Sequence, residues 1–429
     1  MNQHKITKQN TSPSRLVIVG KNDHDPLKEK NNTNMKNTNM KNKVNDIHIA
    51  TINCRSLRTP EKLQELELAI EELKWDIIGI SEMRRFGEGI ENHGKYVLHY
   101  KGETPGLYGV GFMVKVNLVN NIEELSGFSE RIAILNIKLP VNGDKEERWS
   151  IIQAYSPTES DKKEDVKTIE KFYENLQNAI DNAHKNVIVM GDFNGQIGIQ
   201  NSGEENTIGN YGYGNRSKNG TRLVNFALEN RLSILNSFYK RKPSKKWTWI
   251  SPNGQYKNEI DFIMSNNRKA FKNISIINNL NFHTDHRMVR VAMSGMFKKT
   301  RRFQNKQLAV QYSGDPKLLL NNLQTSLDAA ELEKKEYPSI QEKYNLLLNQ
   351  LKTVTRKTNK NIKKEVSLTI KQLLQERKEL SRQKEIKGNR QRVTEVSKKI
   401  SEQLRKERKT KRSNTMKSYI EKTGGIKKA

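Results

Sequence analysis

The sequence predicts an α/β domain between about residues 46 and 296, flanked by two segments of a different character. Within this region, short runs rich in β-branched residues alternate with amphipathic segments and polar loops, a pattern typical of alternating strands and helices. The chain has 429 residues, which is enough for one large domain with a sizeable core and additional segments. We therefore divide the chain into residues 1–45, 46–296 and 297–429.

The expected strands of the central region are apolar runs bounded by polar residues. They cover residues 47–53, 76–82, 96–101, 108–115, 131–139, 149–155, 186–190, 260–264, 274–279 and 287–293. Three helices are expected at residues 60–74, 161–184 and 219–229, and Pro60 suits the first position of its helix because that position needs no N–H donor.

The two flanks differ from the centre in composition. Residues 1–45 are rich in Asn, Lys, Thr and Ser, and the sequence Asn-Thr-Asn-Met-Lys occurs twice, at 32–36 and 37–41. Such a segment buries too little apolar surface to offset the entropy of ordering, so we expect a disordered tail. Residues 297–429 are rich in Lys, Arg, Glu, Gln and Leu, which predicts a basic helical arm. Leucine spacing near 346–351 and 373–380 is not a sustained heptad, so coiled-coil pairing stays open.

Positive charge is concentrated in the flanks. The formal net charge is +29 and the pI is about 9.8, and the flanks carry about 27 of these charges. A strongly basic chain favours a polyanionic partner, either nucleic acid or an acidic membrane surface. The basic run 405–412 is compatible with a nucleic-acid or nuclear-import role and equally with a solvated helix face.

Cysteine content and hydropathy exclude several classes of protein. Cys54 is the single cysteine, so the chain has neither an intramolecular disulfide framework nor a cysteine-rich zinc site. Residues 1–10 lack the apolar segment of a secretory signal, and no apolar run approaches the roughly 20 residues needed to span a bilayer. We expect a soluble intracellular protein in a reducing compartment.

Polar residues occur where the expected strands end. Asn53 and Glu82 each close a strand, as does Tyr155, and Asp192 and Asn194 follow the run that ends at residue 190. Two further groups stand near expected strands: Asp261, inside the apolar run 260–264, and Asp285 with His286, before the last strand. Binding sites of α/β proteins form where strands terminate, so this distribution predicts a site at one edge.

These residue types suit hydrolysis of a phosphodiester. That reaction needs hard oxygen ligands for a divalent cation, a base for water, and donors that stabilise charge on the phosphate. We expect Glu82 and Asp285 to bind Mg²⁺ and Asp192 to take the proton of water. The expected donors to phosphate oxygens are Asn53, Asn194, Tyr155 and His286. An acid inside a buried strand needs a partner, and an Asp261–His286 pair would favour the charged imidazole.

Each residue also has a structural interpretation. Asp192 and Asn194 fit a turn, since Asp and Asn bond their own backbone there. Asn53 and Glu82 fit caps or solvated edges, and Tyr155 fits a core ring with a satisfied hydroxyl. His286, with His283 and Asp285, also fits a surface cluster or a transition-metal site, although no zinc motif supports the latter. The combination, rather than any one residue, favours catalysis.

The ordered series of motifs resembles the endonuclease/exonuclease/phosphatase superfamily, which is related to DNase I and the apurinic endonucleases. The motifs are Asn53, Glu82, Ala-Tyr-Ser-Pro at 154–157, Gly-Asp-Phe-Asn at 191–194, Ile-Asp-Phe at 260–262 and Thr-Asp-His at 284–286. The stretches 214–223 and 247–252 narrow the resemblance to the apurinic-type endonucleases of non-LTR retrotransposons. It covers residues 46–296 and implies a four-layer α/β/β/α sandwich, the DNase I-like fold.

The resemblance also implies roles for individual residues. Asn53, Glu82 and Asp285 correspond to metal-side residues, with Mg²⁺ expected and Mn²⁺ as an alternative. Asp192 corresponds to the residue that orients or deprotonates the attacking water. The remaining expected roles are transition-state contacts for Asn194 and Tyr155, phosphate binding for His286 with Asp261, and a hydroxyl near the cleaved strand for Thr248. The family expectation is a 3′-hydroxyl end that primes reverse transcription.

Two features depart from the family pattern. Repair-type apurinic enzymes often carry a further acid just after the first Asn, whereas Arg55, Ser56 and Leu57 stand here, which disfavours a dedicated abasic-site role. The chain also ends at residues 424–429, about where related elements begin a reverse transcriptase, so a truncated element product or a host-retained fragment is expected.

The resulting hypothesis is a Mg²⁺-dependent endonuclease that nicks DNA in the nucleus. We expect DNA as its partner, with no membrane binding and no evident obligate protein partner. Two alternatives remain. One is a phosphodiesterase of the same scaffold acting on a phospholipid or phosphoinositide. The other is a domesticated nucleic-acid-binding module whose site is no longer used.

Overall fold

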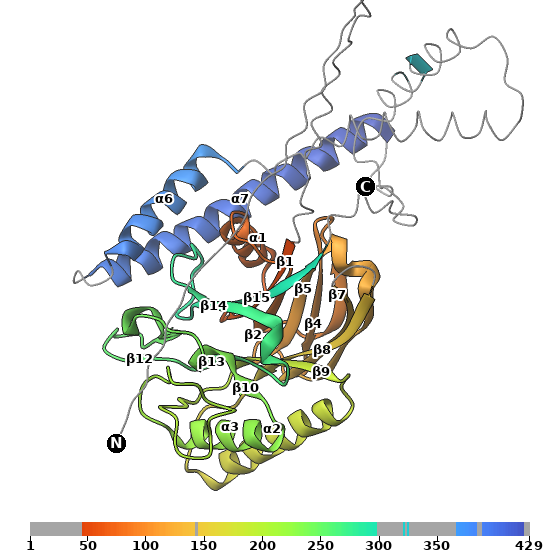
Figure 1. Cartoon of the computed structure of the whole chain (residues 1–429). Helices are drawn as coiled ribbons and strands as arrows, with labels where there is room; N and C mark the ends of the chain where they lie inside the picture. Colours follow the sequence, from red (N-terminus) through yellow and green to blue (C-terminus); the bar gives the residue numbers. More distant parts are fainter. Residues whose placement is uncertain are drawn as a thin grey trace, which may run out of the picture. The chain divides into compact units, whose positions relative to one another are not determined.

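The computed structural model describes residues 45–141, 145–297, 321, 324–325, 366–383 and 388–423. Almost all of the N-terminal tail expected at 1–45 lies outside these ranges, as do the residues 346–351 and 424–429. The central region forms two large β-sheets, which face each other in Figure 1.

The first sheet has seven strands in the order β14-β15-β1-β2-β5-β4-β3. These are β14 (Phe271–Ile277), β15 (Met288–Phe297), β1 (Asn45–Asn53), β2 (Ile77–Ser81), β5 (Val110–Lys115), β4 (Tyr96–Gly102) and β3 (Gly87–Asn92). Only β1 and β2 run parallel; the other neighbours are antiparallel.

The second sheet has six strands in the order β10-β13-β9-β8-β7-β6. These are β10 (Ser233–Ile234), β13 (Asp261–Ser265), β9 (Asn186–Asp192), β8 (Lys145–Tyr155), β7 (Ile132–Val141) and β6 (Ile122–Ser129). Here β8 and β9 form the parallel pair. A separate two-stranded ribbon consists of β11 (Trp249–Ile250) and β12 (Lys257–Asn258).

Three apolar cores separate four layers of structure. The first core fills the space between the sheets and includes Trp149, Phe112 and Ile263. The second lies on the outer face of the six-stranded sheet, under α2 (Lys163–Asp181) and α3 (Lys218–Glu229), as Figure 1 shows. The third lies between the seven-stranded sheet and α1 (Pro60–Ile70). The expected four-layer α/β/β/α sandwich is therefore confirmed.

Local sequence signals explain where the helices begin. The side chain of Thr59 accepts a hydrogen bond from the backbone N–H of Lys62, and Pro60 follows it as the first helical residue of α1. Ser217 accepts in the same way from the N–H of Gly220 at the start of α3. Such N-caps satisfy backbone donors that have no partner within the helix.

Parallel pairing brings the strand ends together. Asn53 at the end of β1 lies opposite Ser81 of β2, and Tyr155 at the end of β8 lies opposite Asp192 of β9. Asp261 begins β13, which is antiparallel to β9, and therefore also pairs with Asp192. The structure thus corrects the expectation that Asp261 lies inside a strand: it is the first strand residue, at the edge where polar groups collect.

A buried polar bridge joins the two sheets close to this edge. Gln153 accepts a hydrogen bond from the Thr51 hydroxyl (3.1 Å) and donates one to the Ser81 hydroxyl (2.8 Å). All three side chains are fully buried, so these bonds offset the cost of placing polar atoms between the sheets. The bridge fixes how the ends of β1, β2 and β8 face one another.

Several elements differ from the sequence expectations. β3 and β6 were not expected; residues 87–92 carry one large apolar side chain, and they form an edge strand whose side chains are alternately half-buried and exposed. β14 begins and ends earlier than expected, and α1 ends at Ile70 rather than at residue 74. The expected positions of α2 and α3 agree with the structure to within about three residues.

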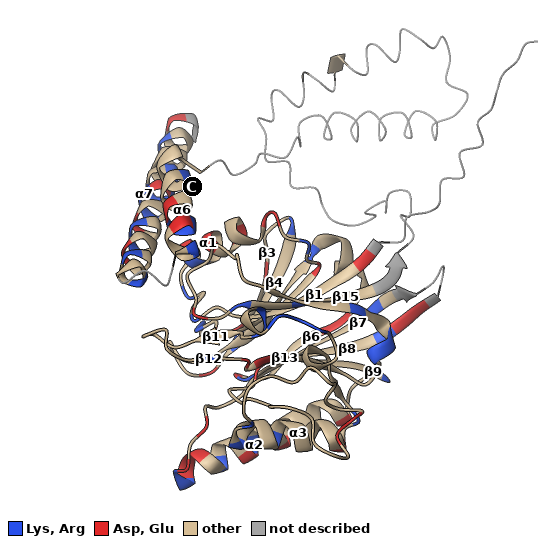
Figure 2. Ribbon diagram, turned by 60° about the vertical axis from the view of Figure 1, so that its left-hand side comes forward, with Lys and Arg blue, Asp and Glu red and all other residues tan. Residues whose placement is uncertain are grey.

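The described part of the C-terminal segment forms a helical hairpin of α6 (Leu368–Arg382) and α7 (Asn389–Thr423). Its two helices pack through a small apolar core that includes Ile370, Leu380 and Ile400. Leu373 and Leu380 therefore pack within the chain. Figure 2 shows Lys and Arg interspersed with Asp and Glu along both helices. Among the described residues, no helix is both long and apolar enough to cross a membrane.

Candidate active site

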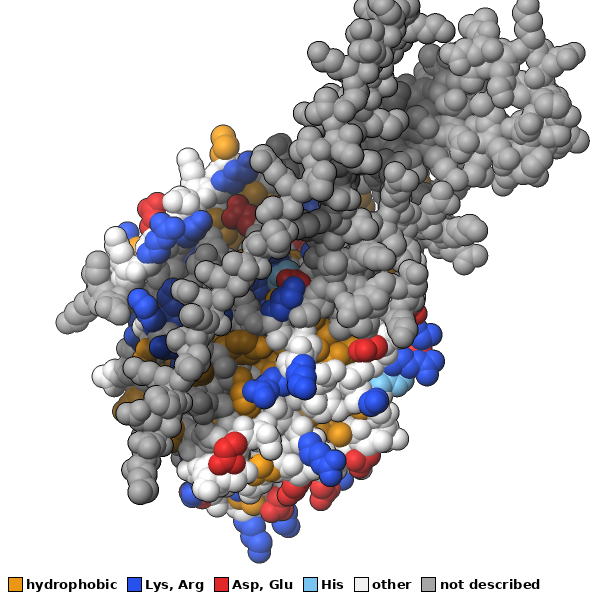
Figure 3. All heavy atoms as spheres, in the orientation of Figure 1, with side chains coloured by type: hydrophobic (Ala, Val, Ile, Leu, Met, Phe, Trp, Pro, Cys, Tyr) orange, Lys and Arg blue, Asp and Glu red, His pale blue; other side chains and the backbone are white. Residues whose placement is uncertain are grey.

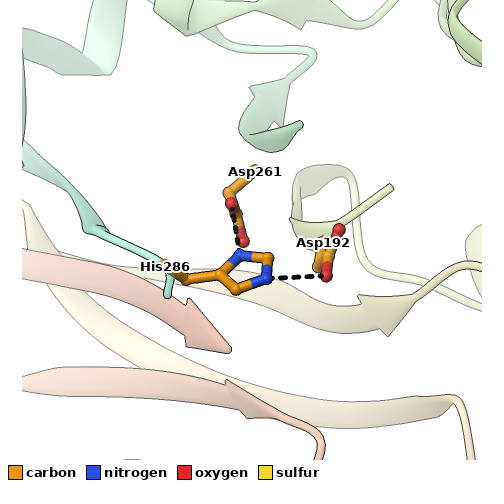
Figure 4. A group of neighbouring side chains, drawn as sticks. All are labelled: Asp192, Asp261 and His286. Atoms are coloured by element: carbon orange, nitrogen blue, oxygen red, sulfur yellow. Dashed lines mark hydrogen bonds and ion pairs between the residues drawn. The ribbon is translucent and has the colours of Figure 1, made fainter. Parts of the chain in front are cut away.

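Asp192, Asp261 and His286 form a buried group at the edge where the strands end (Figure 4). Nδ1 of His286 lies 2.9 Å from Oδ2 of Asp261, and Nε2 lies 3.8 Å from Oδ2 of Asp192. The imidazole is therefore held between two carboxylates that come from β9 and β13, while His286 precedes β15 of the other sheet. The expected pairing of Asp261 with His286 is present.

This arrangement shifts the protonation of the group. Burial and the nearby Asp261 carboxylate raise the pKa of Asp192 to about 7, against the lowering effect of His286 and Asn53. Burial alone would lower the pKa of His286, but the carboxylates of Asp261 and Asp192 outweigh it and raise that pKa to about 9. At neutral pH the imidazole is therefore charged, and Asp192 is poised between its two protonation states.

Two asparagines orient Asp192. The side-chain amide of Asn53 donates to Oδ2 of Asp192 (2.9 Å), and the backbone N–H of Asn194 donates to Oδ1 (3.0 Å). The Asn194 side chain donates to the carbonyl of Ser156 (2.9 Å), which closes the loop after β8 onto the loop after β9. Asp192 thus ends β9 and bonds the backbone two residues on, the local contact that the structural interpretation expected, while Asn53 of β1 holds its second oxygen.

Thr248 lies beneath Asp261 instead of facing the surface. Its side chain is fully buried, and its hydroxyl accepts hydrogen bonds from the backbone N–H groups of Ile260 and Asp261, both at 3.0 Å. The expectation that this hydroxyl contacts the cleaved strand does not agree with its burial. Thr248 positions the first residue of β13 and so the partner of His286.

Glu82 and Tyr155 form a second pair at the same edge. The Tyr155 hydroxyl donates to Oε1 of Glu82 (3.1 Å), and Arg84 donates to the same oxygen (3.1 Å). Burial raises the pKa of Tyr155, and the carboxylates of Glu82 and Asp192 raise it further, so this phenol stays protonated beside both acids. Tyr155 thus connects the Glu82 pair with the group around Asp192.

Two of the expected site residues have an unusual backbone. Glu82 has φ 56° and Asn194 has φ 46°, both in the left-handed region. Residues other than glycine adopt this region at a cost of about 1–2 kcal/mol, least for Asn. Strain of this kind is concentrated at functional sites, where it aims a side chain that ordinary strand geometry would point elsewhere.

Asp285 presents an oxygen suited to a cation. Its Oδ2 accepts a hydrogen bond from the indole N–H of Trp249 (3.3 Å). Its Oδ1 is shielded from solvent and has no hydrogen-bond partner among the described residues; the nearest cation is Nε of Arg55, 3.7 Å away. A buried carboxylate oxygen without a donor is costly, and a bound metal ion would relieve this cost.

One group of side chains is close enough together to share a metal ion. Asp192, Asp261 and His286 each offer a ligand atom within 4.8 Å of the others, so the described residues contain a group that could hold a metal. Both ring nitrogens of His286 already face carboxylates, however, and a charged imidazole does not ligate metal. Carboxylate oxygens such as those of Glu82 and Asp285 suit a hard cation by type, but the contacts described above do not join these two acids to each other.

Sequence reasoning missed several residues that the structure places at the site. Arg131 lies over the rings of Tyr108 (4.0 Å to the centroid) and Tyr155 (5.2 Å), and donates to the Tyr155 carbonyl (3.2 Å). Trp249 and Arg55 contact Asp285. Arg131 stands at the start of an expected strand with nothing nearby to mark it, whereas Arg55, two residues after Asn53, was noted only as a departure from the family pattern.

The fold and the buried Asp–His–Asp group agree with what was expected for the endonuclease/exonuclease/phosphatase superfamily, and the matches to known proteins support this assignment. Residues 149–290 match the family model described as Endonuclease-reverse transcriptase. The match includes Tyr155, Asp192, Asp261 and His286.

Two curated relatives are named craniofacial development protein 2. The protein from Bos taurus is 30% identical over 223 residues, which is 51% of this chain and 36% of the relative. The protein from Tragulus javanicus is 29% identical over 223 residues, which is 51% of this chain and 37% of the relative. The chain spans little more than a third of the length of these relatives.

The sequence identity to solved structures is lower than the identity to these relatives. The catalytic domain of Xenopus laevis APE2 aligns with 58% of this chain and 91% of its own, at 17% identity and a TM-score of 0.44. The endonuclease domain of TRAS1, a telomere-specific non-LTR retrotransposon, aligns with 59% of this chain and all of its own, at 14% identity and a TM-score of 0.40.

Proposed function

We propose that this protein is a Mg²⁺-dependent endonuclease that hydrolyses a phosphodiester bond of DNA and leaves a 3′-hydroxyl end. The observation that carries the proposal is the pairing of His286 with two carboxylates, Asp261 at 2.9 Å and Asp192 at 3.8 Å, in one buried group. This places a candidate base and a candidate cationic donor side by side, as attack on a negatively charged phosphate requires.

The side chains divide the chemistry as follows. Asp192, oriented by Asn53 and Asn194, accepts the proton of the attacking water. The charged imidazole of His286 donates to a phosphate oxygen, and Asp261 holds the ring and maintains its charge. The second N–H of the Asn194 side-chain amide supplies a further donor toward the developing negative charge, and Tyr155 does so when its hydroxyl turns from Glu82 to the phosphate.

A divalent cation would be held by Glu82, Asp285 and Asn53, whose hard oxygens suit Mg²⁺ and also accept Mn²⁺. When bound, such an ion would supply positive charge against the phosphate and the departing oxygen. Oδ1 of Asp285, which has no hydrogen-bond partner among the described residues and only the more distant ion pair with Arg55, supports this assignment. The match of residues 149–290 to the family model described as Endonuclease-reverse transcriptase supports an endonuclease activity. DNA as the substrate and a 3′-hydroxyl as the product are what the resemblance implies.

The test is nicking of supercoiled plasmid by the full chain, with Mg²⁺ or with EDTA. The wild type is compared with Asp192→Ala and His286→Ala, and Asp161→Ala serves as a control because that side chain is largely exposed. We expect nicking with Mg²⁺ by the wild type and the control, and a loss of at least 100-fold in the two site variants. Extension of the nick by a DNA polymerase without phosphatase treatment tests the 3′-hydroxyl.

The alternatives give different outcomes. A wild type that binds DNA without nicking it identifies a binding module whose site is unused. Hydrolysis of phosphoinositide or sphingomyelin vesicles in place of plasmid identifies a lipid phosphodiesterase. We also propose a nuclear location, since the substrate is there and the basic run at 405–412 is largely exposed on α7. Microscopy of the tagged chain, with and without substitutions in this run, tests the location.

A further inference from the structure

A cavity of about 580 Å³ lies directly beside the candidate active site. Asp285, His286 and Arg287 line it from the catalytic domain. The hairpin of α6 and α7 lines it as well, through residues that include Arg382 and Arg390. The C-terminal hairpin therefore contributes to the surroundings of the site, although all of the expected catalytic residues belong to residues 46–296.

A buried arginine holds the hairpin against the domain. Arg377 of α6 is 2% exposed and pairs with the fully buried Glu65 of α1. It also donates to Oδ1 of Asn281 (3.0 Å) and to the Asn281 carbonyl (2.7 Å), and the Asn281 side chain donates to the carbonyl of Leu374 (2.9 Å). Glu65 further accepts from the backbone N–H of His283 (3.2 Å). The same contacts thus hold the loop that leads to Asp285 and His286.

Two further contacts fix the hairpin. Nη1 of Arg390 donates to the carbonyl of Ser251 (3.3 Å), and its guanidinium lies over Gly254 in the turn between β11 and β12. Farther along α7, Arg408 pairs with Glu61 of α1 (3.0 Å). Several independent contacts therefore hold the hairpin, including the part that lines the cavity, against the domain.

Three of the arginines that line the cavity beside the Asp285 carboxylate form no ion pair with a described residue. Arg287 lies over the Trp247 ring (3.1 Å to the centroid) and donates to the carbonyls of Ser244 and Trp247. Arg382 is exposed, and Arg390 donates only to a carbonyl. Within the described ranges, none of these three arginines has a carboxylate partner. Figure 3 shows several Lys and Arg side chains together in the region of α6 and α7.

We propose that this cavity binds the sugar-phosphate backbone of duplex DNA next to the cleaved bond, and that Arg382 and Arg390 of the hairpin contact its phosphates. Arginine suits this task because its planar fork binds phosphate oxygens in pairs. The position fits as well, because Asp285 and His286 line the cavity and the proposed function places the reacting phosphate beside them. This inference rests on the proposed function for the identity of the ligand.

The test measures binding without cleavage. A fluorescein-labelled duplex of about 30 base pairs is titrated with the full chain in EDTA, at several salt concentrations, and followed by anisotropy. The Arg382→Gln/Arg390→Gln variant is compared with a matched control, Lys371→Gln/Lys398→Gln, which removes two exposed charges from the same helices outside the cavity. Circular dichroism checks that both variants keep their helices.

We expect the arginine variant to bind at least 10-fold more weakly, with a log K against log salt slope shallower by about two, since each lost phosphate contact removes about 0.9. The lysine control should change affinity less than 2-fold. In plasmid nicking, the arginine variant should show a raised KM with kcat nearly unchanged.

The outcomes separate this inference from the proposed function. Equal losses in the arginine and lysine variants, or no loss in the arginine variant, would overturn the assignment of the cavity even if the wild type nicks DNA. Selective loss of binding in the arginine variant, with a wild type that never nicks, would support the cavity as a DNA site and reject the nuclease.

Discussion

The side-chain amide of Asn53 donates a hydrogen bond of 2.9 Å to Oδ2 of Asp192, and this bond joins the end of a strand in one sheet to the end of a strand in the other. The same carboxylate oxygen lies 3.8 Å from His286. Asn53 thus sets both the direction and the protonation of Asp192, because a donor favours the charged carboxylate.

Replacement of Asn53 by Ala should slow nicking by about 10- to 100-fold, the usual effect of losing a residue that orients a catalytic group. Without the amide, the pKa of Asp192 should rise, so the loss should be larger at pH 6 than at pH 8. Asn182→Ala, at an exposed position after α2, is the control. An equal loss at both pH values would show that Asn53 does not act through Asp192.

The rate of nicking should depend on pH in a bell shape. Asp192 must be deprotonated to accept a proton, so the rate should rise with pH up to its pKa of about 7. His286 must be protonated to donate, so the rate should fall above its pKa of about 9. Single-turnover nicking at saturating Mg²⁺ measures the profile. A His286→Gln variant should lose the fall at high pH; a fall that persists would assign it to another group.

Gly191→Ala should destabilise the domain and displace Asp192. Gly191 has φ +148°, and a Cβ there would lie 1.9 Å from the carbonyl oxygen of Ala154 on β8. Relief of this clash requires movement of backbone in a parallel pair, at a cost of about 1–3 kcal/mol in unfolding free energy.

Chemical denaturation measures the cost, with Gly203→Ala as the control. Gly203 also has a positive φ, but a Cβ there meets nothing within 4 Å, so only backbone strain of about 1 kcal/mol is expected. Similar losses in both variants would show that the contact with Ala154 is unimportant.

Arg377→Ala should weaken attachment of the C-terminal hairpin by about 3–5 kcal/mol, because Glu65 would remain buried without its main partner. Both side chains are almost completely buried. The expected result is earlier proteolysis within residues 366–423 and a lower denaturation midpoint.

Arg392→Ala, an exposed arginine on α7, should leave both measurements unchanged. Because Asn281 and His283 share these contacts, Arg377→Ala should also lower kcat for nicking, whereas the Arg382→Gln/Arg390→Gln variant should mainly raise KM. An unchanged kcat would show that the hairpin does not hold the loop before Asp285.

The fold class and the positions of most strands could be predicted from the sequence, because buried segments appear in it as regular patterns of apolar residues. Residues 47–53, 149–155 and 186–190 are apolar runs that end in or just before polar residues, and each lies within a strand of the structure. β3 was not predicted, because an edge strand with one large apolar residue shows no such pattern.

The candidate residues also followed from the sequence, but their relationships did not. Asp192, Asp261 and His286 were expected on the basis of residue type and motif order, and Thr248 was expected as a substrate contact. Which oxygen faces which nitrogen depends on register between strands that are far apart in the chain, and the burial of Thr248 depends on the packing of the β11–β12 ribbon against β13.

By itself, then, the sequence determined a periodic α/β chain with acids, amides and a histidine at strand ends, because local pattern governs both strand formation and where strands stop. Only the tertiary structure decided that these ends meet at one edge, that Thr248 supports Asp261, and that Arg377 attaches a C-terminal hairpin beside the site. The physical reason is that pairing between sheets and burial of a single ion pair depend on contacts across more than 100 residues, which no local pattern records.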